Sequence, residues 1–345
     1  MSRPSSGNQQ VVGVKKDLAS WLRGHRSPTA TRTRPLKGLR VLSMFAGAGG
    51  MDLGFQKAHH EVIWANDFDD DAVATHRLNL GSHIVGGDIS KVRLASLPKA
   101  DVVAAGFPCQ GFSRANIHRA AADDRNNLYV HVVRFLRHIK PKFFMLENVK
   151  GILSLNKGAD FSEIHAALEE SGYRVDFRVL NAADFGVPQH RLRVIICGVR
   201  RDLDDSLEFV FPKATHSKDG STGQKWLTAG EALKGIPEPD RPHRLLNHVG
   251  SQYKVTNRDF TGHRRMNPKQ PSPTILARGN GGGGVCALPH PANHRRLTVR
   301  ESAILQSFPM NFAFTGKLMS MYRQIGNAVP PLLAQHLAHS FRERC

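Results

Sequence analysis

The sequence predicts an α/β fold with a largely parallel sheet, joined to a second, smaller domain. Over about the first 200 of its 345 residues, short apolar runs alternate with segments of helical periodicity. A glycine-rich segment directly follows the first apolar run, where backbone can come close to a ligand. After about residue 205 the alternation stops, and Pro, Gly, His and Arg become frequent.

The apolar runs are the expected strands, and the helical segments connect them. The runs lie at 39–45, 62–65, 84–85, 102–105, 143–146, 174–180 and 193–199. An amphipathic stretch at 51–58 predicts the first helix, and 297–308 and 330–341 predict two late helices. Open α/β sheets hold their ligands at the carboxyl ends of the strands, so the residues that follow these runs are the candidates for chemistry.

Composition predicts how the chain is divided. Residues 1–36 carry seven Lys or Arg against Asp17, which predicts a largely disordered basic tail. Residues 37–204 and 316–345 are expected to form the large domain, with 205–292 as the smaller domain and 293–315 as a hinge segment.

The net charge of +19 predicts a polyanionic partner, with nucleic acid as the first candidate. The basic charge is concentrated, because residues 241–300 contain eleven Lys or Arg and one acid, Asp259. A merely basic surface or tail is the alternative explanation.

No membrane or secreted class is indicated. No apolar run approaches the roughly 18 residues of a membrane span, and the N-terminus lacks an apolar signal core, so a soluble, cytoplasmic protein is expected. None of the four cysteines forms a C-x-x-C pair. We therefore expect neither a disulfide framework nor a metal site.

Residues 45–55, FAGAGGMDLGF, predict a binding turn for a nucleoside-containing cofactor. Asp67, at the end of the second strand, can accept hydrogen bonds from ribose hydroxyls. Asp88 ends the third strand and can accept from an adenine amino group, while Phe68 can lie against the adenine face. The turn lacks the G-x-G-x-x-G spacing that seats a pyrophosphate, so an adenosyl ligand without phosphates fits better than a dinucleotide.

Cys109 in GFPCQGFS, residues 106–113, is the candidate nucleophile. It directly follows the run at 102–105, so it lies just past the carboxyl end of a strand. Pro108 stiffens the approach and Gly111 permits an unusual turn. An isolated cysteine is more often a small buried hydrophobe, so position alone leaves both interpretations open.

Several motifs, taken together and in order, resemble the bacterial DNA (cytosine-5-)-methyltransferases of restriction-modification systems. Besides the FAGAGG and GFPCQGFS segments, they are ENVKG at 147–151, QHRLR at 189–193, RLTVRESAILQSFP at 296–309 and QIGNAVP at 324–330. The resemblance covers about residues 39–335, apart from much of the second domain. It implies a Rossmann-like S-adenosylmethionine-dependent methyltransferase fold, with 205–292 as a DNA-recognition domain that selects the target.

The resemblance implies a role for each catalytic residue. The Cys109 thiolate would attack ring carbon 6 of a flipped-out cytosine, so that carbon 5 can accept a methyl group. Glu147 would donate to ring nitrogen 3 and accept from the exocyclic amine, with Asn148 holding the active-site loop. Arg191 and Arg193 would clamp the ring carbonyl oxygen and a phosphate. Without the resemblance, an acid at a strand end and two arginines on a strand are as readily surface groups.

The resemblance also implies two sets of binding residues. The cofactor is S-adenosyl-L-methionine, with S-adenosyl-L-homocysteine as product, and its expected contacts are Phe45, Ala46, Gly47, Gly49, Gly50, Asp67, Phe68, Asp88, Ile89, Pro108, Leu128, Asn327, Ala328 and Val329. The expected DNA contacts are Gln110, Ser113, Arg114, Arg258, His263, Arg264, Arg265 and Arg278.

The expected partner is double-stranded DNA with a specific cytosine-containing site, bound by a monomer, with a cognate restriction endonuclease that forms no stable complex. Three alternatives remain open. They are a transfer-RNA methyltransferase of the same fold, a DNA-binding protein without catalysis, and a nicotinamide-dependent oxidoreductase, for which the glycine spacing is wrong.

Overall fold

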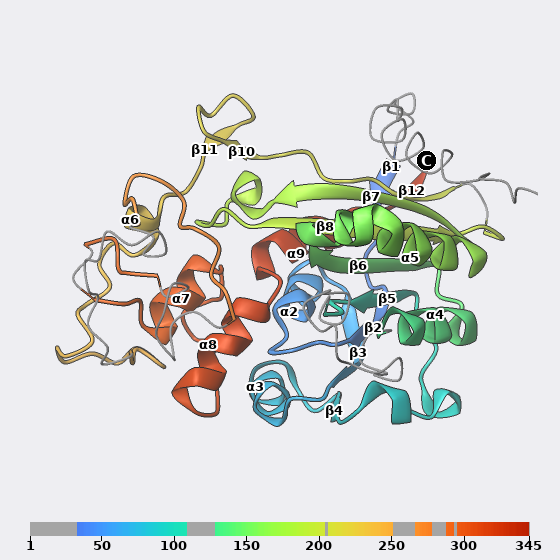
Figure 1. Cartoon of the computed structure of the whole chain (residues 1–345), viewed down its shortest axis with the longest axis horizontal. Helices are drawn as coiled ribbons and strands as arrows, with labels where there is room; N and C mark the ends of the chain where they lie inside the picture. Colours follow the sequence, from blue (N-terminus) through green and yellow to red (C-terminus); the bar gives the residue numbers. More distant parts are fainter. Residues whose placement is uncertain are drawn as a thin grey trace, which may run out of the picture.

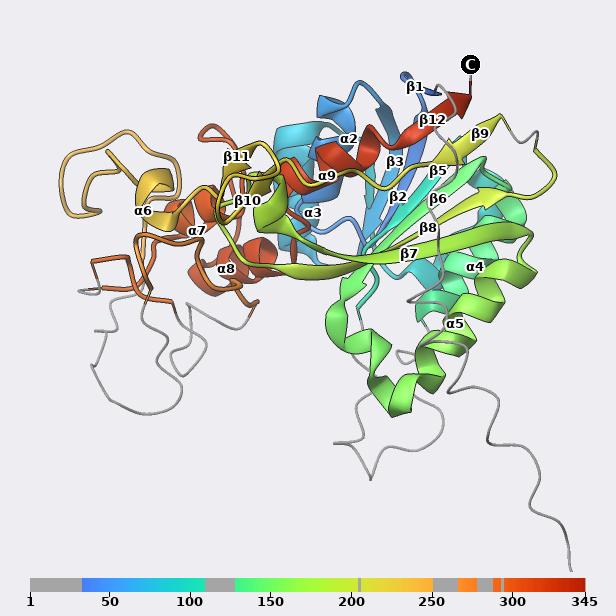
Figure 2. The same ribbon diagram turned by 90° about the horizontal axis from the view of Figure 1, so that it is seen from above.

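A computed structural model describes residues 33–108, 128–203, 206–250, 266–277, 288–292 and 295–344. A large sheet with helices on both faces forms one part of the molecule (Figure 1). Three further helices gather beside it, away from α4 and α5, in a part with little regular structure (Figures 1 and 2). Within the described ranges, no helix combines the length and apolarity needed to cross a membrane.

The large sheet has seven strands in the order β4-β3-β2-β5-β6-β8-β7. Six of them run in the same direction, and β8 between β6 and β7 is antiparallel to both. The predicted largely parallel sheet is therefore confirmed. In sequence order the strands are β2 (Arg40–Met44), β3 (Glu61–Asp67), β4 (Ile84–Gly86), β5 (Val102–Ala105), β6 (Phe143–Val149), β7 (Tyr173–Asn181) and β8 (Leu192–Arg200).

Apolar side chains alternate between the two faces of this sheet, and helices cover both. Val41 on β2 joins the cluster under α2 (Gly50–Lys57) and α9 (Pro331–Ala338). Its neighbour Leu42 joins the cluster under α4 (Leu128–Ile139) and α5 (Ala159–Glu170). Strands buried on both faces read as continuous apolar runs, which is why the sequence predicts them well. The helix α3 (Asp70–Leu80) connects β3 to β4.

The smaller part packs around a third apolar cluster. It is built from α6 (Ala229–Ala232), α7 (Val299–Leu305) and α8 (Leu318–Asn327), with the loops between them. Both α6 and α7 begin with a capping box, in which Thr228 pairs with Glu231 and Thr298 with Glu301. The helix α8 contributes to this cluster although it lies beyond residue 316, where the large domain is expected to resume. The boundary itself stays a prediction.

A second sheet joins segments from three places in the chain, in the order β1-β12-β9 (Figure 2). Its strands are β1 (Thr33–Pro35), β9 (Leu207–Phe209) and β12 (Phe341–Arg344), and a separate two-residue pair consists of β10 (His216–Ser217) and β11 (Gln224–Lys225). The predicted late helix at 330–341 is wrong at its end. Phe341 begins a strand because its ring packs against Phe143 and Phe209, at centroid distances of 5.0 and 5.3 Å.

Candidate active site

Five parallel strands bring the predicted cofactor residues to one edge of the sheet. The turn at 45–50 follows β2, Asp67 ends β3 with Phe68 directly after it, and Asp88 follows β4. Residues 106–108 follow β5, and Glu147 lies near the end of β6. This edge is where open α/β sheets bind ligands. The structure therefore brings together residues that lie up to 100 positions apart in the sequence.

The glycine turn is shaped by close backbone packing. A Cβ at Gly49 would lie 2.8 Å from Cδ2 of His76, and one at Gly50 would lie 2.3 Å from the carbonyl oxygen of Val329. Neither position has room for a side chain. A Cβ at Gly47 would meet no atom within 4 Å, so that part of the turn faces open space.

Asp67 supports this turn from the next strand. Its Oδ2 accepts a hydrogen bond from the Gly47 amide at 2.7 Å, and its Oδ1 accepts one from the Asp69 amide at 2.9 Å. Burial raises the pKa of the Asp67 carboxyl above its ordinary value. The adjacent Phe68 is 77% exposed, so a flat apolar ring stands beside the open side of the turn.

Asp88 begins a short 3₁₀ turn after β4 and remains exposed. Its Oδ1 accepts from the Ser90 amide at 2.8 Å, and this hydrogen bond lowers the pKa of the carboxyl. Arg134 on α4 donates to the carbonyl oxygens of Ile89 and Ser90, at 2.8 and 3.0 Å. The turn is thus held against α4, whose first residue, Leu128, is half-buried.

The end of α8 reaches the same place from the other end of the chain. Asn327 is the last residue of the helix and is exposed. A Cβ at Gly50 would lie 3.2 Å from the Ala328 methyl group, as well as close to the Val329 carbonyl. Residues 327–329 therefore lie beside the glycine turn, although nearly 280 positions separate them in the sequence.

Glu147 forms an ion pair with Arg193 across neighbouring antiparallel strands. Nε of Arg193 lies 2.6 Å from Oε1 of Glu147, and both side chains are about nine-tenths buried. The contact is not an aligned hydrogen bond, so Oε1 has no hydrogen-bond donor among the described residues. A Cβ at Gly106 would lie 3.7 Å from Oε2, which places this oxygen beside the segment that leads to Cys109.

Asn148 holds that segment in place. Its Nδ2 donates to the Phe107 carbonyl oxygen at 3.0 Å, and its Oδ1 accepts from the Val149 amide at 2.8 Å. The predicted loop-holding role of Asn148 is therefore confirmed for residue 107. Pro108 is exposed, and Cys109 itself lies outside the described residues.

Arg191 is buried and bonds to backbone carbonyls in this structure, and its predicted role as a substrate clamp stays a prediction. It is 1% exposed, and its guanidinium donates to the carbonyl oxygens of Ile275, Gly326 and Ala328 at 3.1, 2.9 and 2.9 Å. Burial lowers the pKa of this guanidinium well below its ordinary value. Gly326 lies in the last turn of α8 and Ala328 directly follows that helix, while Ile275 lies in irregular backbone. Carbonyls at such places have no partner within a helix or sheet, so a buried side-chain donor pairs with them. Of the two arginines, only Arg193 contacts Glu147.

The sequence of this chain matches a known protein family. The model of the C-5 cytosine-specific DNA methylase family matches residues 39–274 and 246–343. The chain belongs to this family. It is therefore an enzyme that transfers a methyl group to carbon 5 of cytosine in DNA.

Named relatives and solved structures are similar over most of this methylase. Type II methyltransferase M.NgoFVII of Neisseria gonorrhoeae is 40% identical, over 87% of this chain and 86% of that protein. Type II methyltransferase M.BspRI of Lysinibacillus sphaericus is 33% identical, over 88% and 81%. A putative DNA modification methyltransferase from an E. coli prophage has the same fold, with a TM-score of 0.70, 24% identity and coverage of 88% and 98%. So has S. pombe Dnmt2, with a TM-score of 0.67, 20% identity and coverage of 87% and 97%.

Sequence reasoning missed two glutamines that join the two parts of the methylase. Gln189 and Gln306 are both completely buried and hydrogen-bonded to each other. Oε1 of Gln189 accepts from the Ile275 amide at 3.0 Å, and Nε2 of Gln306 donates to the Ala328 carbonyl oxygen at 2.8 Å. Both residues lie within the motifs named above. The signal that could have revealed them is a polar side chain in a segment whose other residues are mostly buried.

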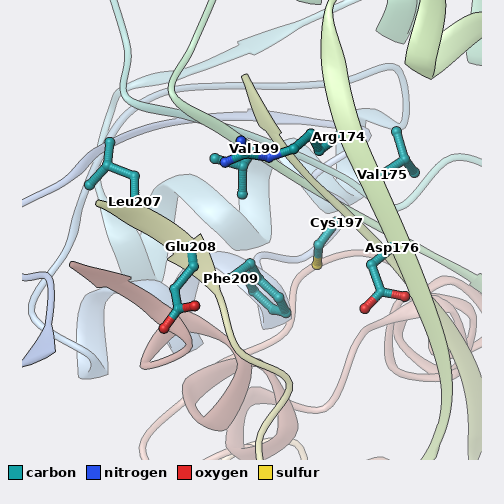
Figure 3. A pocket seen from close by; sticks show the side chains of 8 residues that line it. All are labelled: Arg174, Val175, Asp176, Cys197, Val199, Leu207, Glu208 and Phe209. Carbon is teal, nitrogen blue, oxygen red and sulfur yellow. The ribbon is translucent and has the colours of Figure 1, made fainter. Parts of the chain in front are cut away.

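The only cysteine in the described part of the methylase is Cys197, and it is not a plausible nucleophile. Burial raises the pKa of its thiol well above the ordinary value, which suppresses the reactive thiolate. It lines a cavity of about 370 Å³ between β7, β8 and β9, together with Asp176 and Phe209 (Figure 3). Cys197 is paired with Met145 in the middle of β6, two residues before Glu147.

The predicted DNA contacts of the methylase cannot be placed. All of them lie outside the described residues, in the gaps at 109–127, 251–265 and 278–287. They stay predictions, as do the domain boundaries.

Proposed function

We propose that this methylase uses Cys109 as nucleophile and Glu147 as the group that activates cytosine at ring nitrogen 3, with S-adenosyl-L-methionine as methyl donor. The observation that carries the proposal is the geometry around Glu147. One carboxylate oxygen contacts Arg193 and the other faces Gly106, while Asn148 holds the carbonyl of Phe107. Cys109 follows Phe107 by two residues in the sequence, which supports a site shared by the thiol and the acid.

The chemistry requires these groups because carbon 5 of cytosine is a poor nucleophile. A bond from the Cys109 sulfur to ring carbon 6 sends electron density toward ring nitrogen 3, where a protonated Glu147 can donate. Its other oxygen can accept from the exocyclic amine. Arg193 would stabilise negative charge on the ring carbonyl oxygen. After methylation, loss of the carbon 5 proton to water expels the thiolate.

The residues at this edge of the sheet support an adenosyl ligand. When bound, S-adenosyl-L-methionine supplies an electrophilic methyl group carried on a sulfonium. Gly47 leaves open space beside the turn, Phe68 offers a flat exposed ring, and the exposed Asp88 carboxylate can accept from an adenine amino group. Asp67 already accepts from the Gly47 amide, so its first role is to shape the turn that receives the cofactor.

The substrate is proposed to be a specific cytosine-containing site in double-stranded DNA, with the base turned out of the helix. The net charge of +19 supports a polyanionic partner. Relatives that share most of this chain are named Type II methyltransferases, which supports a place in a bacterial restriction-modification system. We propose that the enzyme acts as a monomer in the cytoplasm.

Methyl transfer from labelled S-adenosyl-L-methionine tests the proposal. Unmethylated genomic DNA should become labelled, transfer RNA should not, and Cys109→Ser should abolish transfer. Cys197→Ala is the matched control, because it removes a buried thiol that lines the separate cavity between β7, β8 and β9. It should retain activity. Label in transfer RNA alone would overturn the DNA substrate.

The nucleophile can be tested separately with DNA that carries 5-fluorocytosine at the target. Fluorine cannot leave as a proton does, so the covalent adduct should persist with the native enzyme and with Cys197→Ala. An adduct that also forms with Cys109→Ser would show that another residue attacks carbon 6.

A further inference from the structure

A buried cluster of three potential metal ligands lies behind the glycine turn. Asp52 is in the first turn of α2, His76 is on α3, and His83 lies just before β4. Their ligand atoms all lie within 4.8 Å of one another. Asp52 and His76 are completely buried, and His83 is half-buried.

Hydrogen bonding within the protein leaves this cluster incompletely satisfied. Ser43 donates its hydroxyl to Oδ1 of Asp52 at 2.6 Å, and Nε2 of His76 lies 2.8 Å from Oδ2. Nε2 of His83 and Nδ1 of His76 are buried without a hydrogen-bond partner in the described part of the chain. Buried polar atoms nearly always have partners, so these two nitrogens call for an explanation.

The chemistry of the three groups matches one class of ligand. One carboxylate and two imidazoles form a set that binds zinc in proteins, usually with water at the fourth position. The Ser43 hydroxyl orients the carboxylate, as outer hydrogen bonds do around metal ligands. The carboxylate is otherwise a fully buried acid whose neighbours are a hydroxyl and an imidazole, and a cation would compensate its charge.

We propose that Asp52, His76 and His83 bind a divalent transition metal ion such as Zn²⁺, which holds α2 against α3. The His76 ring faces the backbone of Gly49, where a Cβ would be only 2.8 Å from Cδ2. A metal that fixes this ring therefore supports the glycine turn from behind. The importance of this metal for cofactor binding rests on the function proposed above. The binding of the metal does not depend on that function.

Cobalt titration tests the site without using enzyme activity. The untagged full chain is stripped with a chelator and titrated with Co²⁺, whose visible absorption reports tetrahedral coordination. We expect one tight site that lacks the near-ultraviolet band of sulfur ligands. His83→Ala and Asp52→Asn should weaken the affinity at least about tenfold. Zn²⁺ should displace the cobalt and raise the melting temperature of the native chain but not of His83→Ala.

The chain contains 18 histidines, so a surface histidine provides the control. His138→Ala removes an exposed imidazole at the end of α4 and should leave the cobalt affinity unchanged. Equal affinity in the native protein and His83→Ala, or no cobalt binding at all, would overturn the proposal. His83→Ala decides the question even if Asp52→Asn fails to fold, because it truncates a ring that is only half-buried.

Discussion

The large sheet and the smaller part of this methylase satisfy their buried backbone in different ways. In the sheet, amides and carbonyls pair from strand to strand, and the side chains between the layers are apolar. In the smaller part, side chains bond to the carbonyls. Arg300 is fully buried and donates to the carbonyl oxygens of Leu246, Pro309 and Phe312 at 2.7, 3.1 and 2.6 Å.

Arg191 repeats this arrangement where the two parts meet, with three carbonyl partners of its own. A buried arginine in this protein is therefore not by itself a sign of catalysis. Where regular structure ends, buried carbonyls still need donors, and a guanidinium can reach several at once. Arg193 differs from these two arginines, because it lies on strand β8 and contacts the carboxylate of Glu147.

The largest expected effect is on activity at the sheet edge. Glu147→Gln keeps the shape of the side chain but removes the acid, so kcat/KM should fall by about 10²–10⁴-fold with little change in melting temperature. Glu170→Gln, at the exposed end of α5, is the matched control and should keep full activity. Steady-state kinetics of both variants measures this. If Glu147→Gln remained active, Glu147 would not be the acid that activates cytosine.

Arg300→Met tests whether side-chain donors stabilise the smaller part. The change leaves three buried carbonyls without their donor, and we expect the free energy of unfolding to fall by about 3 kcal/mol. Arg137→Met on α4 removes an exposed guanidinium and should change stability by less than about 0.5 kcal/mol. Urea denaturation measures both. Equal stabilities would contradict the contrast between the two parts.

Two arginines that lie two residues apart should separate stability from catalysis. Arg191→Met should lower the free energy of unfolding by about 2 kcal/mol, because three carbonyls lose a donor. Arg193→Met should lower kcat by roughly 10²-fold, because it removes a positive group beside Glu147. Denaturation and kinetics on the same two proteins decide this. If Arg191→Met were fully stable and Arg193→Met fully active, the two roles would be misassigned.

The pH dependence of stability that comes from the buried His60 should be the smallest of these effects. Nδ1 of His60 accepts from the Leu39 amide at 3.2 Å, so the ring is neutral and its Nε2 faces the Ala338 carbonyl oxygen at 3.1 Å. Burial lowers the pKa of His60 in the folded state below its unfolded value of about 6.5. Stability from this group is therefore fully present above the unfolded pKa, and it is lost as pH falls from that value through the lower folded pKa.

Melting curves between pH 8 and pH 5 check this sign. His60→Gln should melt at a lower temperature than the native protein at pH 8, and the difference should shrink toward pH 5. A constant difference across that range would mean that the titration of His60 contributes nothing.

The strands of the large sheet could be predicted from local sequence, and the same sequence predicts where the chemistry lies. Strands buried on both faces leave continuous apolar runs, so their positions can be recognised locally. Motifs in order then located the cofactor turn, Glu147 and the loop held by Asn148. The final strand at Phe341 was missed, because its burial depends on rings from β6 and β9 that are far away in the sequence.

The partners of the buried polar groups could not be predicted from the sequence, because they depend on long-range packing. The sequence placed Arg191 and Arg193 in one motif and gave them one role, but their partners come from segments up to 137 residues away. The cluster of Asp52, His76 and His83 has no recognisable metal-binding spacing, and it exists because α2 packs near α3. Local periodicity reports which residues are buried. The partner of a buried polar atom is set by long-range packing, which periodicity does not record.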